Sequence, residues 1–327
     1  MSEFVTWVLT GERTGDNNQV LALAEALERP FEVKRLDYNM LHSLSVWLPP
    51  TVLTLTKSAR EGLRPPWPDL LITIGRRSVP AARWIKRQNR GGTRLIHIGH
   101  PRVDPGLFDL VITTRQYPVP PGDNVLLLPV AMSRYVDPPV PTAEEIAWLG
   151  RVPRPRTLLA IGGETKYWTL SADRIEQIVI ETAPGATKIV ATSRRTDPAL
   201  VERLRKLAAT SPDIRLVDDS LPRFALLLTE ADQIYVTGDS ISMLSEAVLA
   251  GKPVALIPID QDAKGRRKLG PAPHEAGPDA RRRDLRRFWN HLIEQGLVGT
   301  VEDGPTRAAS IPDPNRIAAD AVRRLLS

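Results

Sequence analysis

The residues best suited to chemistry lie in one stretch, residues 236–258, with the sequence Val-Thr-Gly-Asp-Ser-Ile-Ser-Met-Leu-Ser-Glu-Ala-Val-Leu-Ala-Gly-Lys-Pro-Val-Ala-Leu-Ile-Pro. An apolar run at 233–237 predicts a strand, residues 243–249 have helical spacing, and Gly251 fits a helix end. The turn between strand and helix holds small polar residues, namely Gly238, Asp239, Ser240 and Ser242. A helix that begins at such a turn leaves backbone N–H groups without partners, and its dipole favours negative charge. The stretch therefore predicts an anion site, most naturally for phosphate.

Side chains must add selectivity to this turn, because a helix dipole contributes only about 0.3–1 kcal/mol at an exposed site. Glu246 lies three residues after Met243 on the predicted helix. Its carboxylate could accept two hydrogen bonds from a vicinal diol such as that of a ribose. The alternative is a solvated helical glutamate, although the surrounding helix is largely apolar.

Two turns in the N-terminal half also follow predicted strands. The first contains glycines that allow a close approach and polar residues that suit either binding or helix capping: Gly11, Gly15, Asp16, Asn17, Asn18 and Gln19. The second consists of Gly75, Arg76 and Arg77, whose guanidinium groups could hold a carboxylate or a phosphate. Solvated arginines are the alternative there, but a helix start is an unfavourable place for positive charge. In open α/β sheets, ligands gather at the carboxyl ends of strands, so both turns are candidate binding turns.

A comparable turn, Gly162-Gly163, follows the strand predicted at 157–161 in the C-terminal half. It could border a ligand or be a plain tight turn. Residues 192–195, Thr192-Ser193-Arg-Arg, follow the next predicted strand and could add hydroxyl groups and charge to the same site.

Several common site patterns are absent from the sequence. There is no GxGxxG dinucleotide fingerprint, no Walker lysine, no nucleophile elbow and no zinc motif. The histidines lack metal-ligand spacing, so each is expected to be structural, with His100 kept as a minor candidate because it follows a strand; they are His42, His97, His100, His274 and His291. We therefore expect neither a metal nor a cofactor.

Composition narrows the class of protein. The 327 residues are 42% hydrophobic, include no cysteine and carry a net charge of +6. This suits a cytoplasmic protein with phosphate-bearing small molecules or an anionic membrane surface as partners. Aromatic residues make up 5% and do not interleave with the basic runs at 266–268 and 281–287, which disfavours nucleic acid. The N-terminal residues show no signal-peptide pattern, and no apolar run is long enough to span a membrane.

Apolar runs alternate with amphipathic runs along the whole chain, which predicts an α/β fold with two Rossmann-like domains facing a cleft. A Pro-rich region at 137–155 separates the two halves and surrounds a short predicted helix. We expect an N-terminal domain at 1–145, a C-terminal domain at 146–312, and a final helix at 313–327 that packs back on the first domain. Residues 262–283, rich in Gly, Pro and Arg, predict a mobile loop.

The sequence resembles the mitochondrial-fission-protein-like family of plants and bacteria, and more widely the GT-B glycosyltransferases. The resemblance rests on the early Gly-Asp-Asn-Asn-Gln turn, the Ile-Gly-Arg-Arg turn, and the Asp-Ser-Ile-Ser-Met-Leu-Ser-Glu-Ala stretch with its Gly-Lys-Pro end. It implies a nucleotide-sugar donor on the second domain, with the diphosphate on the turn 240–243, the ribose on Glu246, and Gly162 and Gly163 at the border. It also implies an acceptor over the first-domain turns and metal-independent catalysis, with Glu12, Asp16 or His100 as the base.

Three functions follow from these expectations. The first is transfer of a sugar from a nucleoside-diphosphate sugar to an acceptor, such as a lipid or cell-envelope precursor, by a cytoplasmic protein held peripherally at a membrane through its basic runs. The second is a non-catalytic scaffold that keeps the fold and binds partners, since fold alone does not establish activity. The third is a sugar-nucleotide epimerase, which would need no acceptor.

Overall fold

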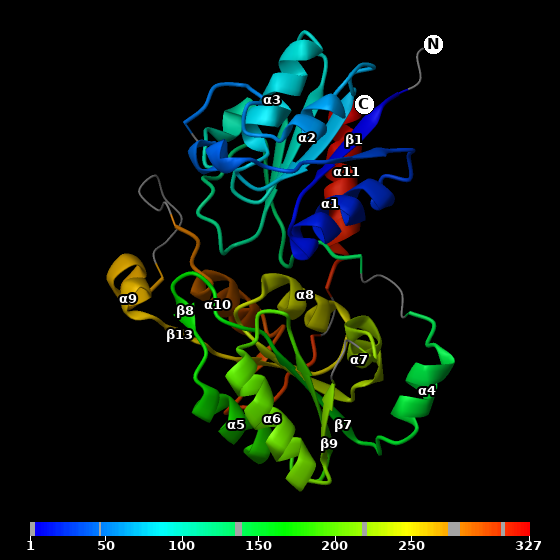
Figure 1. Cartoon of the computed structure of the whole chain (residues 1–327), viewed down its shortest axis with the longest axis vertical. Coiled ribbons are helices and arrows are strands. Elements are labelled where there is room, and N and C mark those ends of the chain that lie inside the picture. Colours follow the sequence, from blue (N-terminus) through cyan, green and yellow to red (C-terminus); the bar gives the residue numbers. More distant parts are fainter. Residues whose placement is uncertain (1–3, 46, 135–138, 218–220, 274–281, 309–310) are drawn as a thin grey trace. The chain divides into compact units, whose positions relative to one another are not determined.

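The computed structural model describes residues 4–45, 47–134, 139–217, 221–273, 282–308 and 311–327. The chain forms two compact units (Figure 1). The first consists of Met1–Arg134, Glu275–Arg283 and Pro312–Ser327, and the second of Tyr135–His274 and Asp284–Ile311. Each unit contains one six-stranded sheet in which every neighbouring pair of strands is parallel.

The first unit has the strand order β2-β1-β3-β4-β5-β6. Its elements are β1 (Thr6–Thr10), α1 (Thr14–Ala26), β2 (Glu32–Arg35), η1 (Met40–Leu44), α2 (Lys57–Glu61), β3 (Leu70–Ile74), α3 (Val79–Gln88), β4 (Arg94–Ile98), η2 (Pro105–Leu107), β5 (Leu110–Thr113), β6 (Val125–Leu127) and α11 (Pro314–Leu326).

Alternation along the central strands of this unit divides its core between two faces. Val8 and Ile72 join one apolar cluster with α1 and α11, and Trp7 and Leu71 join another with α2 and α3. The last helix of the chain thus packs beside the first (Figure 1). Because both faces are covered by helices, the central strands β1 and β3 are buried almost throughout, as is typical of parallel strands.

The second unit has the strand order β10-β9-β7-β11-β12-β14, with a separate two-stranded ribbon of β8 and β13. Its elements are α4 (Ala143–Leu149), β7 (Arg156–Ile161), β8 (Trp168–Thr169), α5 (Ala172–Glu181), β9 (Thr187–Thr192), α6 (Pro198–Thr210), β10 (Ile214–Val217), α7 (Phe224–Glu230), β11 (Gln233–Thr237), α8 (Ile241–Leu249), β12 (Val254–Ile257), β13 (Asp260–Gln261), α9 (Ala263–Leu269), α10 (Arg286–Glu294) and β14 (Gly299–Thr300). Helices α5 and α6 cover one face of this sheet.

The strand orders place a topological switch point in each unit. In the first unit the chain moves to opposite sides of β1, and in the second to opposite sides of β7. Ligands of open α/β sheets bind at such points, outside the carboxyl ends of the strands. The relevant turns are therefore those after β1 and β3 in the first unit and after β7 and β11 in the second.

The predicted α/β class with two Rossmann-like sheets is confirmed. The prediction of a mobile loop at 262–283 is wrong for residues 263–269, which form α9. Asp262 caps this helix by accepting a hydrogen bond from Gly265 N–H, and Leu269 is buried, so a cap and an apolar anchor outweigh the Gly- and Arg-rich composition. Residues 274–281 of that segment, which include His274 and Arg281, lie outside the described residues.

A second correction concerns the start of α1. The helix begins at Thr14. Asp16, Asn17 and Asn18 therefore lie inside the helix and do not cap a helix that begins after them. The N-cap is Arg13, without a side-chain cap bond. The reason is that the Asn17 side chain bonds to the preceding turn, which leaves it unavailable to cap the helix.

Candidate functional site

The polar turn after β11 opens α8 in the second unit. Ser240 is the N-cap, and its hydroxyl accepts a hydrogen bond of 3.4 Å from Met243 N–H. The helix begins at Ile241, two residues before the predicted start. The N–H groups of Ile241 and Ser242 receive no acceptor from the described part of the chain. These two donors, at the positive end of a nine-residue helix, suit an anion.

Asp239 braces the end of β11 against the end of β7. Its carboxylate is fully buried and accepts hydrogen bonds from Thr237 Oγ1 (2.7 Å), Gly163 N–H (3.1 Å) and Arg195 Nη2 (2.6 Å). Thr237 Oγ1 also accepts a bond of 2.7 Å from Gly162 N–H. Asp239 therefore acts as the anchor of this site rather than as a surface that a ligand could touch.

Arg195 is the side chain that Asp239 positions. One edge of its guanidinium is held by the buried carboxylate, while 44% of the side chain stays exposed. Asp239 directly precedes the Ser240 cap, so a fixed positive charge lies next to the start of α8. A fixed guanidinium beside free helix N–H groups is an arrangement typical of phosphate recognition.

The loop that carries Arg195 is itself locked to the sheet. Thr196 is buried and donates to the Gly162 carbonyl oxygen at 2.6 Å, and it accepts from Ser193 N–H at 2.9 Å. The Ser193 hydroxyl in turn accepts from Arg195 N–H at 3.1 Å. Thr192, half-buried, ends β9 just before this loop. The predicted residues Thr192 and Ser193 therefore lie at the site, with Ser193 bonded within its own loop.

Three glycines of the site are needed by the protein itself. A Cβ at Gly162 would lie 2.1 Å from Asp239 Oδ1, one at Gly163 would lie 1.9 Å from the Arg195 carbonyl oxygen, and one at Gly238 would lie 2.5 Å from Trp289. The close approach predicted for a ligand is thus made by neighbouring loops and by α10. Contact of these glycines with a donor stays a prediction.

The other predicted donor residues lie on the exposed side of the α8 start. Ser242, Met243 and Glu246 are all half-buried in α8. Glu246 lies one turn beyond the free N–H groups, a spacing that suits a group bound next to a phosphate. The structure brings these residues together with the Asp239–Arg195 pair at the switch point of the second sheet.

In the first unit, the turn after β1 is closed by Asn17. Its side-chain oxygen accepts from Gly11 N–H at 2.8 Å, and its amide donates back to the Gly11 carbonyl oxygen at 2.8 Å. Gln19 donates to the Gly15 carbonyl oxygen at 3.4 Å, and Asn18 is half-buried. Asn17 therefore shapes the turn, and its two-way bond uses the groups that would otherwise reach a ligand.

The turn after β3 faces the same region of the first unit. Gly75 has a φ of +72°, and Arg76 after it is exposed. Arg77 forms an ion pair of 3.4 Å with Glu12 and lies over the Tyr38 ring at 5.9 Å. The turns after β1 and β3 are thus connected through Arg77, as the switch-point geometry predicts.

Two of the three predicted bases have altered acidity. Burial raises the pKa of Asp16, although nearby Arg13 and Arg283 act in the opposite direction. Burial and then the charge of Arg102 lower the pKa of His100 to about 4, so its ring is neutral at pH 7. Glu12 is exposed and paired with Arg77. Asp16 therefore holds a proton more readily than an ordinary aspartate does, and its role as the base stays a prediction.

Among the described residues, no group of His, Asp and Glu could hold a metal ion. Within the same residues, no helix is long and apolar enough to cross a membrane.

With this geometry in place, the chain can be compared with known proteins. Residues 14–325 match the family described as Mitochondrial fission ELM1. This chain belongs to that family. The resemblance found in the sequence is therefore confirmed.

One curated relative in the ELM1 family is the mitochondrial fission protein ELM1 of Arabidopsis thaliana. It is 27% identical to the chain over 235 residues, which cover 62% of the chain and 54% of that protein. The chain thus spans about half the length of this relative.

Solved structures extend the likeness to the fold. The UDP-GlcNAc 2-epimerase of Methanocaldococcus jannaschii, in complex with UDP-GlcNAc and UDP, matches with a TM-score of 0.52, 12% identity and 99% of both chains covered. The spinosyn forosaminyltransferase SpnP matches with a TM-score of 0.53, 14% identity and 100% of both chains covered. At these identities the likeness concerns the fold alone, and it gives this ELM1-family chain the GT-B type of fold.

Sequence reasoning about this ELM1-family chain missed several residues of the site. Thr196 and Thr237 are buried and hold the loops together, yet neither was predicted. Tyr38 was also missed, and burial raises its pKa beside the Glu12 and Arg77 side chains. The available signal was a Thr at the end of a strand, as Thr237 is, or in the loop after one, as Thr196 is, and such residues are too common to be selective.

Proposed function

We propose that this protein is a metal-independent glycosyltransferase that moves a sugar from a nucleoside-diphosphate sugar to an acceptor hydroxyl. The observation that carries the proposal is the pairing of Arg195 with buried Asp239 beside the free N–H groups of α8. The diphosphate binds these N–H groups and the guanidinium, and Glu246 binds the ribose hydroxyls. Gly162 and Gly163 border the donor.

In the proposed reaction the acceptor oxygen bonds to the anomeric carbon, and the bond from that carbon to the diphosphate oxygen breaks. The acceptor proton passes to a carboxylate of the protein, and the diphosphate leaves with the electron pair. Fixed N–H dipoles and the Arg195 charge stabilise the negative charge that develops on the diphosphate, which is the role that metal ions have in other transferases.

The acceptor side is proposed for the first unit, at the turns after β1 and β3. Asp16 is the base that we favour, because its pKa is raised and it lies at the switch point. Glu12 is held by Arg77, and His100 Nδ1 accepts from Arg102 N–H at 3.1 Å, which leaves only its other nitrogen for a proton.

We propose a lipid or cell-envelope precursor as the acceptor, used by a cytoplasmic protein at the inner face of a membrane. The net charge of +6 supports an anionic surface as the partner. The basic residues 266–268, on α9, are one candidate for that contact. No nucleic acid and no cofactor are part of the proposal.

A thermal-shift screen against UDP, GDP, ADP, CMP and their sugars tests the donor site. A ligand at a hundred times its dissociation constant stabilises the folded state by about 2.7 kcal/mol, a rise of several degrees in the midpoint. We expect Arg195→Gln to weaken binding about tenfold or more and Arg194→Gln, its exposed neighbour, to change it little. Each shift is taken relative to the variant's own unliganded midpoint. Equal shifts in both variants would remove Arg195 from the site.

A sugar-nucleotide epimerase is the second candidate, because the chain shares its fold with an epimerase solved with UDP-GlcNAc and UDP. The two activities differ in their need for an acceptor. Interconversion of a purified sugar nucleotide without any acceptor would support the epimerase, and release of the free nucleotide only when an acceptor is present would support the transferase. Binding without either reaction would indicate a non-catalytic scaffold.

A further inference from the structure

The first unit exposes a group of large apolar side chains on one loop. The loop spans residues 39–55, between β2 and α2, and includes η1. Its exposed apolar residues, which we name the apolar loop patch, are Met40 (91% exposed), Leu41 (46%), Leu44 (49%), Trp47 (84%) and Leu53 (55%). Single exposed apolar residues need no explanation, but five within fourteen positions do.

The loop that carries the patch is held at its base. Asn39 N–H donates to the Thr54 carbonyl oxygen at 3.0 Å, and its side-chain amide donates to the carbonyl oxygens of Leu53 (2.7 Å) and Leu55 (3.0 Å). Arg60 Nε donates to the Leu55 carbonyl oxygen at 2.9 Å. Hydrogen bonds therefore close the loop at its base, and the exposed apolar side chains belong to a folded loop.

The charged residues next to the patch in the sequence are mostly basic. Residues 38–60 contain no Asp and no Glu, and they include Lys57 and Arg60, with Arg64 shortly after. The nearest acidic residues are Asp37, which pairs with Arg35, and exposed Glu61. An apolar surface with basic residues beside it matches an anionic lipid bilayer, where apolar side chains enter the acyl boundary and cations meet the head groups.

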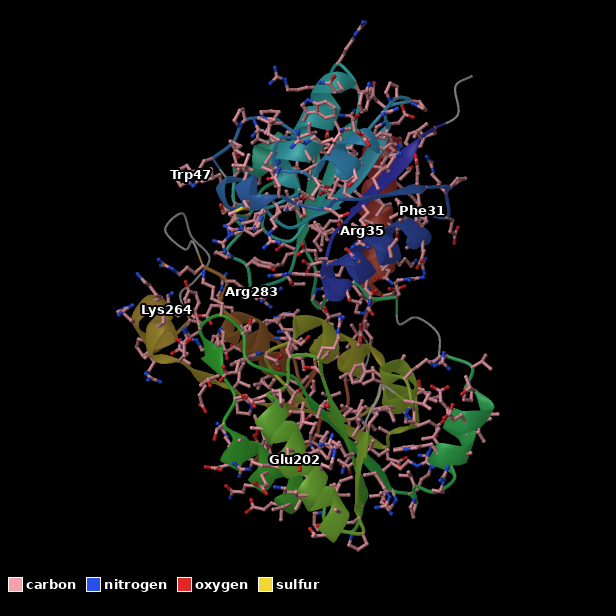
Figure 2. The ribbon with its side chains drawn as sticks, in the orientation of Figure 1. Phe31, Arg35, Trp47, Glu202, Lys264 and Arg283 are labelled. Carbon is pink, nitrogen blue, oxygen red and sulfur yellow. The ribbon has the colours of Figure 1, made fainter. Side chains whose placement is uncertain are left out.

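The patch also lies next to the proposed acceptor side. Its base continues from Tyr38, whose ring lies under Arg77 and within 3.8 Å of a Cβ built at Gly11. Figure 2 shows Trp47 at the edge of the first unit, away from its sheet. A bilayer in contact with this loop would therefore be close to the turns after β1 and β3.

We propose that the apolar loop patch docks the first unit onto an anionic lipid bilayer. Met40 and Trp47, the two most exposed members, enter the interface, and Lys57 and Arg64 face the head groups. Trp suits this depth because its ring is apolar and its N–H can stay hydrated. The inference deepens the proposed function and rests on it only for the acceptor, a lipid-borne molecule delivered at the same surface.

Vesicle co-sedimentation of the 327-residue chain tests the docking, with phosphatidylcholine vesicles and with vesicles that contain phosphatidylglycerol. The test variant is Met40→Ser/Trp47→Ser. The matched control is Val140→Ser, an equally exposed apolar residue of the second unit (86%). A second comparison, Lys264→Gln/Lys268→Gln, tests α9 of the second unit, where Figure 2 labels Lys264.

We expect the wild-type protein to sediment with anionic vesicles and the test variant to bind them about a hundredfold more weakly, about tenfold for each side chain removed from the apolar phase. The Val140→Ser control should bind as the wild type does. The α9 variant, which removes only a secondary basic contact, should weaken binding less than the test variant does. Replacing Lys57 and Arg64 by Gln should reduce binding about fivefold for each charge, with little effect at high salt.

Three results would overturn the docking proposal. One is equal vesicle binding by the wild type and the test variant. Another is loss of binding in the α9 variant alone, which would assign the contact to the second unit. The third is a wild type that ignores vesicles but forms a dimer that the test variant loses, which would make a second copy the occupant. Nucleotide thermal shifts in the test variant separate this from the proposed function, because they depend on the second unit and should be unchanged.

Discussion

Removal of the buried carboxylate of Asp239 should cost more stability than removal of the arginine that it holds. In Asp239→Ala, the buried N–H of Gly163 loses its only acceptor among the described residues, at a cost of about 1–3 kcal/mol. Thr237 loses less, because its hydroxyl can turn toward the Ala160 carbonyl oxygen, 3.4 Å away. Arg195 is 44% exposed and regains water, which limits its loss to about 0.5–1 kcal/mol.

These contributions add to about 2–4 kcal/mol for Asp239→Ala. Arg195→Ala should cost about 1–2 kcal/mol, because Asp239 keeps two donors and water enters the space left by the arginine. The double variant should show a coupling energy of about 1 kcal/mol. Asp213→Ala is the control. It removes a 3.5 Å ion pair with Lys188, which is 5% exposed and keeps its bond to the Ile180 carbonyl oxygen. Because the Asp213 side chain is 49% exposed, this change should cost at most about 0.5–1 kcal/mol.

Urea denaturation followed by hydrogen exchange of peptides from β7 and β11 measures these values in the unit concerned. Exchange is preferred to a single spectroscopic signal because a chain of two units need not unfold in one step. A cost below about 1 kcal/mol for Asp239→Ala, or a larger cost for Arg195→Ala, would refute the argument that the Gly163 N–H dominates.

Three further predictions concern packing and acidity. Burial lowers the pKa of His97 to about 3, below its ordinary 6.5. Between these two pH values the unfolded chain binds one more proton than the folded chain does. The free energy of unfolding therefore falls by about 1.4 kcal/mol per pH unit as the pH drops from 6.5 toward 3. In urea midpoints measured against pH, His97→Leu should reduce this pH dependence by the contribution of one proton. The variant should lose no stability at pH 7, since neither ring nitrogen has a hydrogen-bond partner among the described residues. An unchanged pH dependence would contradict the role given to His97. Gly238→Ala should destabilise the second unit by about 1–3 kcal/mol or more through the clash with Trp289, and an unchanged midpoint would show that α10 moves freely. Arg286→Lys should raise the rate of proteolysis at 269–272. The Arg286 guanidinium donates to four carbonyl oxygens there and to Asp284, and a lysine ammonium cannot reproduce this planar set of donors. Cleavage at the wild-type rate would show that other contacts hold the segment.

Local pattern determined the class of fold and the place of the turns. Runs such as 70–74 and 158–161 are apolar apart from Thr73, which is typical of parallel strands covered on both faces. Helical spacing between such runs predicted the β/α alternation. Because chain direction places every carboxyl end on one edge of such a sheet, the turns after 74 and 237 could be predicted as binding turns without any tertiary information. These features depend only on neighbours in sequence.

Tertiary structure alone decided which side chains meet at those turns and what each of them does. Asp239 and Arg195 are 44 residues apart, and their bond exists because β9, β7 and β11 lie side by side. The same adjacency explains Gly163, whose missing Cβ admits the Arg195 backbone. Spacing could not show this, because a contact between distant segments depends on strand order, which periodicity leaves open. For the same reason the sequence could not distinguish the exposed Trp47 from the buried Trp7, Trp168 and Trp289.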